Sequence, residues 1–257
     1  MAMDQAIQER EKQFYDEEWK KITVREIRGR VVIPQVPTLS GKRVLVCSCG
    51  TGIEAVQAAL EGADVYAFDI SETAVQNARA MAEFNNVPMQ VQAMDFHHLT
   101  YPDDFFDIVY GSAILHHIDC DVVGRNIHRV LKPGGVAYFR ENSDRNPLLR
   151  WIRRLAFGKP GGYQRQRFLF FRRNGTTDEY PLTEEEVRTL RDIFHGNLQR
   201  YNQTFEFFYL LNAMIFKKRS VGRKLRAFDR FVVRVLPFLR RYSFQQELWM
   251  QKPSGKP

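Results

Sequence analysis

Residues 44–52 read VLVCSCGTG, an apolar run that ends in two closely spaced glycines. This pattern is typical of a β-strand that leads into a tight turn beneath a nucleotide. Ser48 stands where the first glycine of such a turn is usual, and a serine can take that place if its φ angle stays negative. Ile53 replaces the third glycine of a dinucleotide fingerprint, and Glu54 at the start of the next helix would repel a pyrophosphate. The stretch therefore favours an adenosine ligand without phosphates.

Around this turn, from residue 42 to residue 140, apolar runs of strand length alternate with helical patterns. The alternation predicts parallel βαβ units with right-handed crossovers and helices on both faces of the sheet. Ser71 is expected to cap the second helix, and the KPGG segment at 132–135 is expected to form a turn. The expected strands are 43–47, 63–70, 89–94, 105–111 and 136–140, and the expected helices are 53–61, 71–84 and 122–131.

The flanking segments complete the predicted architecture. Residues 4–19 have a helical apolar pattern, and residues 28–41 contain two prolines and indicate an extended linker. Further along, we expect helices at 147–157 and 183–194, the second opened by a capping box of Thr183 and Glu186. Strands are expected at 197–208 and 243–251, with a helical insertion of about 35 residues between them.

The predicted fold class is α/β. We expect a doubly wound, mostly parallel, Rossmann-like sheet of seven strands, six parallel and the last antiparallel. An N-terminal helix precedes it, and a C-terminal helical cap is inserted before the last strand. The predicted units are an N-terminal arm and linker over residues 1–38, a ligand-binding core over 39–144, and a cap with the last two core strands over 145–257.

The composition is that of a folded globular protein. The chain has 257 residues, of which 44% are apolar, and this is enough for a substantial core. No apolar run reaches the roughly 18–20 residues of a membrane-spanning helix, and the polar N-terminus is unlike a signal peptide, so we expect a cytoplasmic location. The three cysteines are too few for a disulfide framework, and Cys47 and Cys49 are expected to be buried strand residues.

Charge is distributed unevenly along the chain. Residues 1–144 carry 14 Lys and Arg against 21 Asp and Glu, whereas residues 145–257 carry 24 against 9. The net charge of +8 therefore combines an acidic first part with a strongly basic second part. The two parts are expected to meet different partners.

Five segments, in a fixed order and at characteristic distances, resemble the class I S-adenosylmethionine-dependent methyltransferases. They are SCGTG at 48–52, AFDIS at 67–71, AMDFHHL at 93–99, FDIVYGSAILHHI at 106–118 and LKPGG at 131–135. The chain is most similar to the small-molecule branch that includes quinone-biosynthesis and natural-product methylases. The likeness covers about residues 40–142.

The resemblance implies S-adenosylmethionine as the methyl donor, S-adenosylhomocysteine as the product, and a set of residues that hold them. Asp69 would accept from the ribose hydroxyls, as a carboxylate can, and it would repel a 2′-phosphate. Asp95 would accept from the adenine amino group, with Phe96 beside it offering its backbone N–H and a ring face. The other implied cofactor contacts are Cys49, Gly50 and Gly52 under the nucleoside, Ile70 next to Asp69, and Gly111 and Ser112 near the methionine end.

One departure from the family pattern concerns the donor's ammonium group. The family usually has an acidic residue inside the first strand, and this chain has Val46 there. Loss of that contact would cost about 1.5–3 kcal/mol unless another acid replaces it. A regulatory protein that binds the cofactor without catalysis is therefore an alternative to an enzyme.

Methyl transfer is an in-line displacement, and the protein contributes mainly alignment and exclusion of water. A hydroxyl or phenol acceptor gains from a general base, which favours His116 or His117 after the fourth strand. The alternative is that one of them packs against a helix and the other is solvated. The pair His97 and His98 is expected on the adenine side or at the surface. No metal is expected, because adjacent residues on an extended chain point to opposite sides.

Acceptor-binding residues are expected on the loops that follow the last parallel strands and on the N-terminal helix. The acceptor itself is expected to be a small, partly apolar molecule, since such sites are mostly apolar pockets. The candidates are Tyr15, Glu141, Asp144 and Tyr180, the last in a cluster with Asp178 and Glu179.

Residues 217–241 contain ten Lys and Arg and a single acid, Asp229, and they form an amphipathic basic helix pattern. Three interpretations remain open. The apolar face can be buried on the core as a substrate cap, with the arginines solvated. The helix can lie on an anionic membrane surface, which would suit a lipid-like or isoprenoid acceptor. An RNA-binding face is disfavoured, although Arg and Phe interleave at 164–173, because no recognised RNA-binding module is present.

Overall fold

The structure is a computed structural model that describes residues 5–20, 22–158, 167–168, 171–172, 180–202, 205–208, 212 and 218–255. Asp178 and Glu179, most of the Arg- and Phe-rich segment at 164–173, and residues 213–217 lie outside the described residues. None of the helices in the described part of the chain is both long and apolar enough to cross a bilayer.

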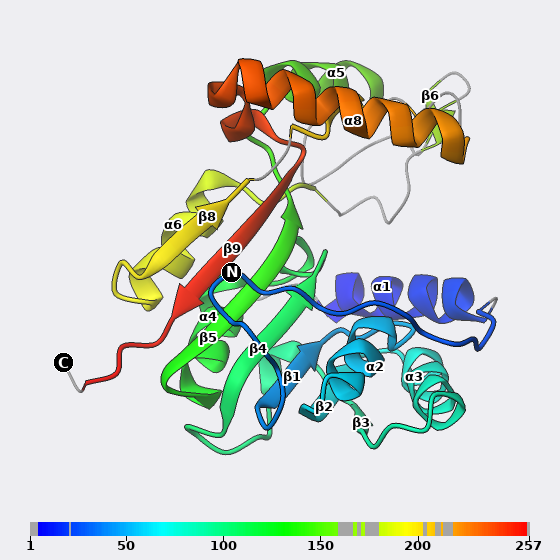
Figure 1. The fold of residues 1–257 in the computed structure, drawn as a ribbon, viewed down its shortest axis with the longest axis vertical. Helices are drawn as coiled ribbons and strands as arrows, with labels where there is room; N and C mark the ends of the chain where they lie inside the picture. The colour runs from blue at the N-terminus through cyan, green and yellow to red at the C-terminus, as the bar shows by residue number, and fades with distance from the viewer. Residues whose placement is uncertain are drawn as a thin grey trace.

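Within the described residues, seven strands form one sheet in the order β3-β2-β1-β4-β5-β9-β8 (Figure 1). Strands β1 to β5 are parallel, whereas β9 is antiparallel to both β5 and β8, so β8 runs in the direction of β1 to β5. The predicted fold class is therefore confirmed. The strands are β1 (Arg43–Cys47), β2 (Asp64–Asp69), β3 (Gln90–Ala93), β4 (Phe106–Ser112), β5 (Leu131–Asn142), β8 (Leu198–Tyr201) and β9 (Gln245–Gln251).

Helices cover both faces of this sheet. The β1 residues Val44 and Val46 share one core with α2 (Ile53–Leu60) and α3 (Glu72–Phe84). Leu45 and Cys47 share the opposite core with α4 (Cys120–Val130) and α6 (Glu184–Ile193). Successive side chains of a strand point to opposite faces, so β1 is apolar throughout because both of its faces are buried.

The remaining elements lie around the carboxyl edge of the parallel strands, the edge at which Asp69, Ser112 and Asn142 end their strands. Helix α1 (Gln5–Trp19) packs against α3. The cap contains α5 (Pro147–Phe157), α8 (Arg219–Val235) and η4 (Pro237–Tyr242), and Figure 1 shows α5 and α8 beyond this edge. Short elements are η1 (Phe96–His98), η2 (Leu115–His117) and a two-stranded sheet of β6 (Arg167–Phe168) and β7 (Phe171–Arg172).

Several local predictions need correction. The strand expected at 197–208 ends at Tyr201, because the chain then leaves the edge of β9 and the carbonyl of Phe205 accepts from the N–H of Phe244 instead. Helix α4 starts two residues early, since Asp119 caps it by accepting from two backbone N–H groups. Residues 132–135 bulge out of β5, whose pairing with β4 jumps to Val136.

The glycine-rich turn is packed tightly against α3. Gly52 has φ +79°, and a Cβ atom there would lie 2.8 Å from the Cα of Ala78, so only glycine fits. Ser48 has φ +48°, which overturns the expectation that a serine would keep a negative φ at this position. The left-handed conformation is strained for a residue with a Cβ. Ser48 therefore adopts, under strain, the backbone conformation that a glycine would adopt at this position.

We predict that Ser48→Gly raises the free energy of unfolding by up to about 1 kcal/mol, because relief of the left-handed strain exceeds the entropy that glycine adds to the unfolded chain. Urea denaturation followed by circular dichroism measures the change. Thr51→Gly is the matched control in the same turn. Thr51 does not have a positive φ, so this variant should lose stability. Equal destabilisation by both variants would contradict the strain at Ser48.

Candidate active site

The carboxylate of Asp69 joins three elements at the end of β2. One oxygen accepts from the N–H of Gly50 at 2.9 Å, and the other accepts from the N–H of Ser71 at 3.0 Å. Ser71 caps α3 through its hydroxyl, which accepts from the N–H of Ala74. Asp69 is 6% exposed. Its carboxylate therefore fixes the glycine-rich turn of β1 to the start of α3.

The charge of Asp69 is held by backbone dipoles. Burial raises the pKa of Asp69 above its usual value, and the N–H groups of Ser71, Gly50 and Ile70 oppose this shift. The nearby carboxylate of Asp16 adds to the rise. Gly50 and Ser71 are the two N–H groups at hydrogen-bond distance from the Asp69 carboxylate. A carboxylate has about four lone-pair positions, so two remain for the hydroxyls of a ligand.

Helix α1 lies against the same turn. The hydroxyl of Ser71 donates to Asp16, and the backbone carbonyl of Trp19 accepts from Asn77 at 2.8 Å. The indole of Trp19 comes within 3.2 Å of the position that a Cβ of Gly50 would occupy. The N-terminal helix thus covers the glycine turn with an aromatic ring and places a second carboxylate beside Asp69.

Asp95 follows β3, the strand next to β2. The N–H of Met94 donates to the carbonyl of Asp69, so Asp69 and Asp95 end neighbouring strands at the same edge. The Asp95 carboxylate accepts from the N–H of His97 at 2.9 Å and lies 2.8 Å from Nδ1 of that ring. Burial raises the pKa of Asp95, but these contacts and one with His98 outweigh it, and the net shift is downward.

The contacts of Asp95 and its neighbours limit which groups after β3 can bind a ligand. The Phe96 ring is buried edge-to-face on Phe68, with the ring centroids 5.1 Å apart, so its face belongs to the core and only its backbone N–H remains for an adenine. His97 is also turned inward, and its Nε2 accepts from the N–H of Asp119 at 3.3 Å. The Asp95 side chain is 28% exposed, so part of the carboxylate stays open to a ligand.

The other predicted cofactor residues surround the ends of β1 and β4. Cys49 is buried, and burial raises the pKa of its thiol well above its ordinary value, so the thiol stays neutral. A Cβ at Gly111 would lie 2.4 Å from the ring of Phe139, so glycine is required there for packing on β5. Ser112 ends β4 opposite Arg140 and is half-buried.

The most connected polar group at this edge is Glu141, near the end of β5. It is 1% exposed, and one carboxylate oxygen accepts from the N–H groups of Ile114 and Leu115, both at 2.9 Å. The other oxygen lies 2.7 Å from Nδ1 of His116. An ionised carboxylate has no proton to give, so Nδ1 carries the hydrogen and Nε2 has the lone pair. Glu141 thus fixes both the loop after β4 and the tautomer of His116.

His117 lies beside this pair and contacts α1. The rings of His116 and His117 are 4.2 Å apart, and the ring of Tyr15 meets His117 edge-on at 6.0 Å. Both histidines are buried. The structure therefore brings together the predicted residues Tyr15, His116, His117 and Glu141, from α1, the β4 loop and β5.

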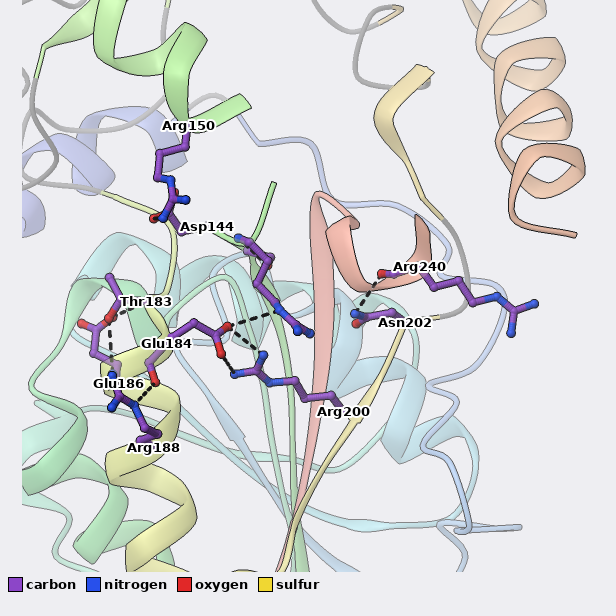
Figure 2. A network of polar contacts seen from close by, with 11 residues as sticks. Asp144, Arg150, Thr183, Glu184, Glu186, Arg188, Arg200, Asn202 and Arg240 are labelled. Atoms are coloured by element: carbon purple, nitrogen blue, oxygen red, sulfur yellow. Dashed lines mark hydrogen bonds and ion pairs between the residues drawn. The ribbon is translucent and has the colours of Figure 1, made fainter. Parts of the chain in front are cut away.

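Two predicted acceptor-binding residues have structural partners instead. Asp144 lies 4.0 Å from Arg150 and 3.9 Å from Arg153 of α5 (Figure 2). The hydroxyl of Tyr180 donates to Glu186, the capping-box residue of α6, at 2.9 Å. Burial and this carboxylate raise the pKa of Tyr180, so its hydroxyl keeps its proton. The first contact ties the segment after β5 to α5, and the second ties the segment before α6 to that helix. An acceptor role for either residue stays a prediction.

Comparison with known proteins identifies the domain that carries this edge. Residues 45–139 match the family model described as a methyltransferase domain. The residues include the turn, Asp69, Asp95 and the histidine pair. The core of this chain is a class I S-adenosylmethionine-dependent methyltransferase domain.

Curated relatives match this methyltransferase domain and little else. The ubiquinone biosynthesis O-methyltransferase of Coxiella burnetii is 34% identical over 108 residues, which are 42% of this chain and 46% of that protein. The protein of the same name from Pseudomonas syringae is 33% identical over 122 residues, covering 45% of this chain and 50% of the relative. The chain thus matches about half the length of these relatives.

Solved structures share the fold over more of the chain. The [4+2]-cyclase SpnF has 18% identity, a TM-score of 0.56 and 95% coverage of both chains. A methyltransferase from Mesorhizobium loti has 21% identity and a TM-score of 0.53, covering 84% of this chain and 93% of that one. A phosphoethanolamine N-methyltransferase from Haemonchus contortus has 16% identity and a TM-score of 0.56, covering 85% and 50%. At these identities the likeness concerns the fold alone.

Sequence reasoning missed the parts of the methyltransferase edge that come from α1. Trp19 contacts the glycine turn and Asp16 contacts Ser71 at the start of α3, yet Tyr15 was the only one of the three predicted as a site residue. A signal for Trp19 was present, since residues 15 and 19 are four apart and lie on one side of a helix. Their rings stack with centroids 5.9 Å apart.

We predict that Glu141→Gln reverses the tautomer of His116 with only a small loss of stability. The glutamine oxygen can still accept from Ile114 and Leu115, but its NH₂ must then donate to Nδ1, which moves the hydrogen of His116 to Nε2. ¹⁵N NMR of the histidine ring nitrogens measures this directly.

Glu141→Leu serves as the comparison, because it leaves two N–H groups without an acceptor and should lower stability by about 1–3 kcal/mol for each. An unchanged His116 tautomer in Glu141→Gln would show that Glu141 does not orient the ring.

Proposed function

We propose that this chain transfers a methyl group from S-adenosylmethionine to a hydroxyl of a small, partly apolar molecule. The observation that carries the proposal is the buried Glu141–His116 pair, held at the same sheet edge as Asp69 within a methyltransferase domain. The fold alone would not suffice, since a [4+2]-cyclase shares it.

The residues at the edge fit the proposed methyl donor. Asp69 has two lone-pair positions left for ribose hydroxyls, and Asp95 and the backbone N–H of Phe96 are suited to an adenine edge. Glu54 is the acid of α2 that acts electrostatically on Cys49 and Tyr110, on the side of the sheet where Val46 replaces the family's acid. We propose that it takes over the role of that acid toward the donor's ammonium.

When bound, S-adenosylmethionine supplies a methyl group on a positively charged sulfur that is a good leaving group. The chain's own task is to present a deprotonated oxygen in line with that methyl. With Nδ1 committed to Glu141, Nε2 of His116 is the nitrogen that can accept the proton of an acceptor hydroxyl. Glu141 stabilises the imidazolium that results, and the Tyr15 and His117 rings exclude water.

A hydroxyl acceptor agrees with two independent considerations. Hydroxyls and phenols must lose a proton during attack, and His116 can accept that proton as a general base. The curated relatives that match the core are named O-methyltransferases of ubiquinone biosynthesis. A quinone-like, natural-product or lipid-like acceptor follows as the proposed class.

We predict that Asp69→Ala abolishes measurable binding of S-adenosylhomocysteine in calorimetric titration, because two charge-assisted hydrogen bonds of about 1.5–3 kcal/mol each are lost. Asp64→Ala is the control on the same strand, since the Asp64 side chain is 53% exposed and pairs with Arg43 at the surface. It should bind like the wild type.

The pH dependence of binding should follow Asp69. Its raised pKa means that affinity falls as the pH is lowered toward that value from above, because the protonated form loses the charge that strengthens both bonds. Equal binding by the wild type and Asp69→Ala would end the proposal.

We further propose that the enzyme meets its acceptor at an anionic membrane surface, through α5 and α8. The apolar side of α8 is only partly buried. Phe231 is 60% exposed and Val235 is 59% exposed, so the interpretation of a fully buried apolar face does not hold for them. On α5, Trp151 and Leu155 are 60% and 61% exposed. This much apolar surface favours a hydrophobic partner.

Arginines flank these apolar side chains. Arg150 and Arg154 line a hollow of about 390 Å³ on α5 together with Pro147, Trp151 and Leu155. The arginines of α8, at positions 223, 226, 230 and 234, are exposed. Apolar side chains that insert between lipids, next to guanidinium groups that pair with phosphates, are the features of a membrane-surface helix.

We predict that the protein sediments with vesicles containing phosphatidylglycerol and that added salt weakens this binding. The double variant Trp151→Ser/Phe231→Ser should bind at least about tenfold more weakly, because burial of each aromatic side chain contributes about 1.5–3 kcal/mol. Val32→Ser/Phe84→Ser is the control, with side chains that are 62% and 58% exposed on other elements. Absence of pelleting by the wild type would remove the membrane proposal and leave methyl transfer in place.

A further inference from the structure

Gln246 is a buried amide without a partner in the described part of the chain. It is the second residue of β9 and is 1% exposed. Neither its side-chain oxygen nor its side-chain nitrogen forms a hydrogen bond with any residue that the structure describes. A buried amide normally has its hydrogen bonds made, and leaving them unmade is costly. A buried amide whose N–H and C=O groups both lack hydrogen bonds, at the edge of an active site, indicates that a ligand binds to it.

The position of Gln246 relates it to the proposed base. Glu141 and Gln246 are directly opposite each other in the antiparallel pair of β5 and β9. Residues paired in this way share a face of the sheet, with Cβ atoms about 4.5–5.5 Å apart. Glu141 points toward His116 on that face, so Gln246 lies on the strand next to the residue that orients His116. Further along the strands, Phe139 and Leu248 on the same face are core residues.

The described neighbours of Gln246 do not form hydrogen bonds with its amide group. Both carboxylate oxygens of Glu141 already have partners, from Ile114, Leu115 and His116. A fold that required only packing here would be served better by an apolar side chain of the same size. The amide group must therefore contribute something other than stability.

We propose that Gln246 is a specificity-determining residue that binds a second polar group of the acceptor, next to the hydroxyl that His116 deprotonates. This inference rests on the proposed function. A glutamine amide offers one N–H and one C=O side by side, so it pairs best with a group that presents an acceptor and a donor in the same way. A carboxamide or lactam edge has this arrangement. The acceptor class is thus a hydroxyl-bearing molecule with a neighbouring amide-like edge.

The first experiment needs no ligand. Gln246→Met removes the amide and keeps the length of the side chain, so the melting temperature should rise by about 2–4 °C, the shift that corresponds to relief of one unmade buried hydrogen bond in a chain of this size. Gln245→Met is the matched control, because Gln245 is the exposed neighbour on β9. A lower melting temperature for Gln246→Met would show that the amide has a structural partner, and it would overturn the proposal.

The second experiment measures binding of two probes by calorimetry in the presence of S-adenosylhomocysteine. 2-Hydroxybenzamide carries a hydroxyl beside a carboxamide, and 2′-hydroxyacetophenone has the same shape with a methyl group in place of the NH₂ donor. The wild type should bind the amide at least about tenfold more tightly than the ketone, and Gln246→Met should bind both equally weakly. Equal affinities in the wild type, or an unchanged preference in Gln246→Met, would contradict the proposal.

The two proposals fail in different ways. If S-adenosylhomocysteine does not bind the wild type, the methyl-transfer proposal fails, and the melting temperatures still decide whether Gln246 lacks a partner. If S-adenosylhomocysteine binds and neither probe does, the amide-like acceptor class is wrong while the cofactor site stands.

Discussion

The buried carboxylate of Asp69 is the interaction on which the arrangement of this protein's ligand edge depends. Two backbone N–H groups, from Gly50 and Ser71, share its negative charge and so bring the turn after β1 and the start of α3 to one point. Their dipoles offset part of the cost of burying the charge. The same contact leaves lone pairs directed away from the backbone, so a group that organises the fold can also bind a ligand.

A second buried carboxylate repeats this arrangement two strands along from β1. Glu141 at the end of β5 binds the N–H groups of Ile114 and Leu115 and orients His116. Parallel strands end at one edge, so loops from β1, β2, β4 and β5 meet there, and each buried acid fixes a loop that follows another strand. The two acids have different roles in the proposed enzyme, since Asp69 binds the methyl donor and Glu141 orients the base, His116. Helix α1 covers both, through Trp19 over the turn and Tyr15 against His117.

Much of the fold could be predicted because its signals are local. The alternation of apolar runs placed β1 at its observed bounds, the helix predicted at 147–157 is α5, and the capping box of Thr183 and Glu186 is present. Tertiary contacts determined what the sequence could not indicate. The pairing of Glu141 with His116 joins residues 25 positions apart, and the contact of Ser71 with Asp16 joins residues 55 apart. The positive φ of Ser48 could not be predicted, because a serine gives no local signal for the left-handed conformation. The roles of Asp95 and the other cofactor residues stay predictions.

The central claim is that Asp69 binds the ribose of S-adenosylmethionine while it still holds the glycine turn. A crystal structure of the full chain with S-adenosylhomocysteine tests this most directly. We expect both ribose hydroxyls within about 3 Å of the Asp69 carboxylate, the bonds to Gly50 and Ser71 intact, and the sulfur facing His116. A nucleoside bound elsewhere, or a ribose that does not contact Asp69, would contradict it.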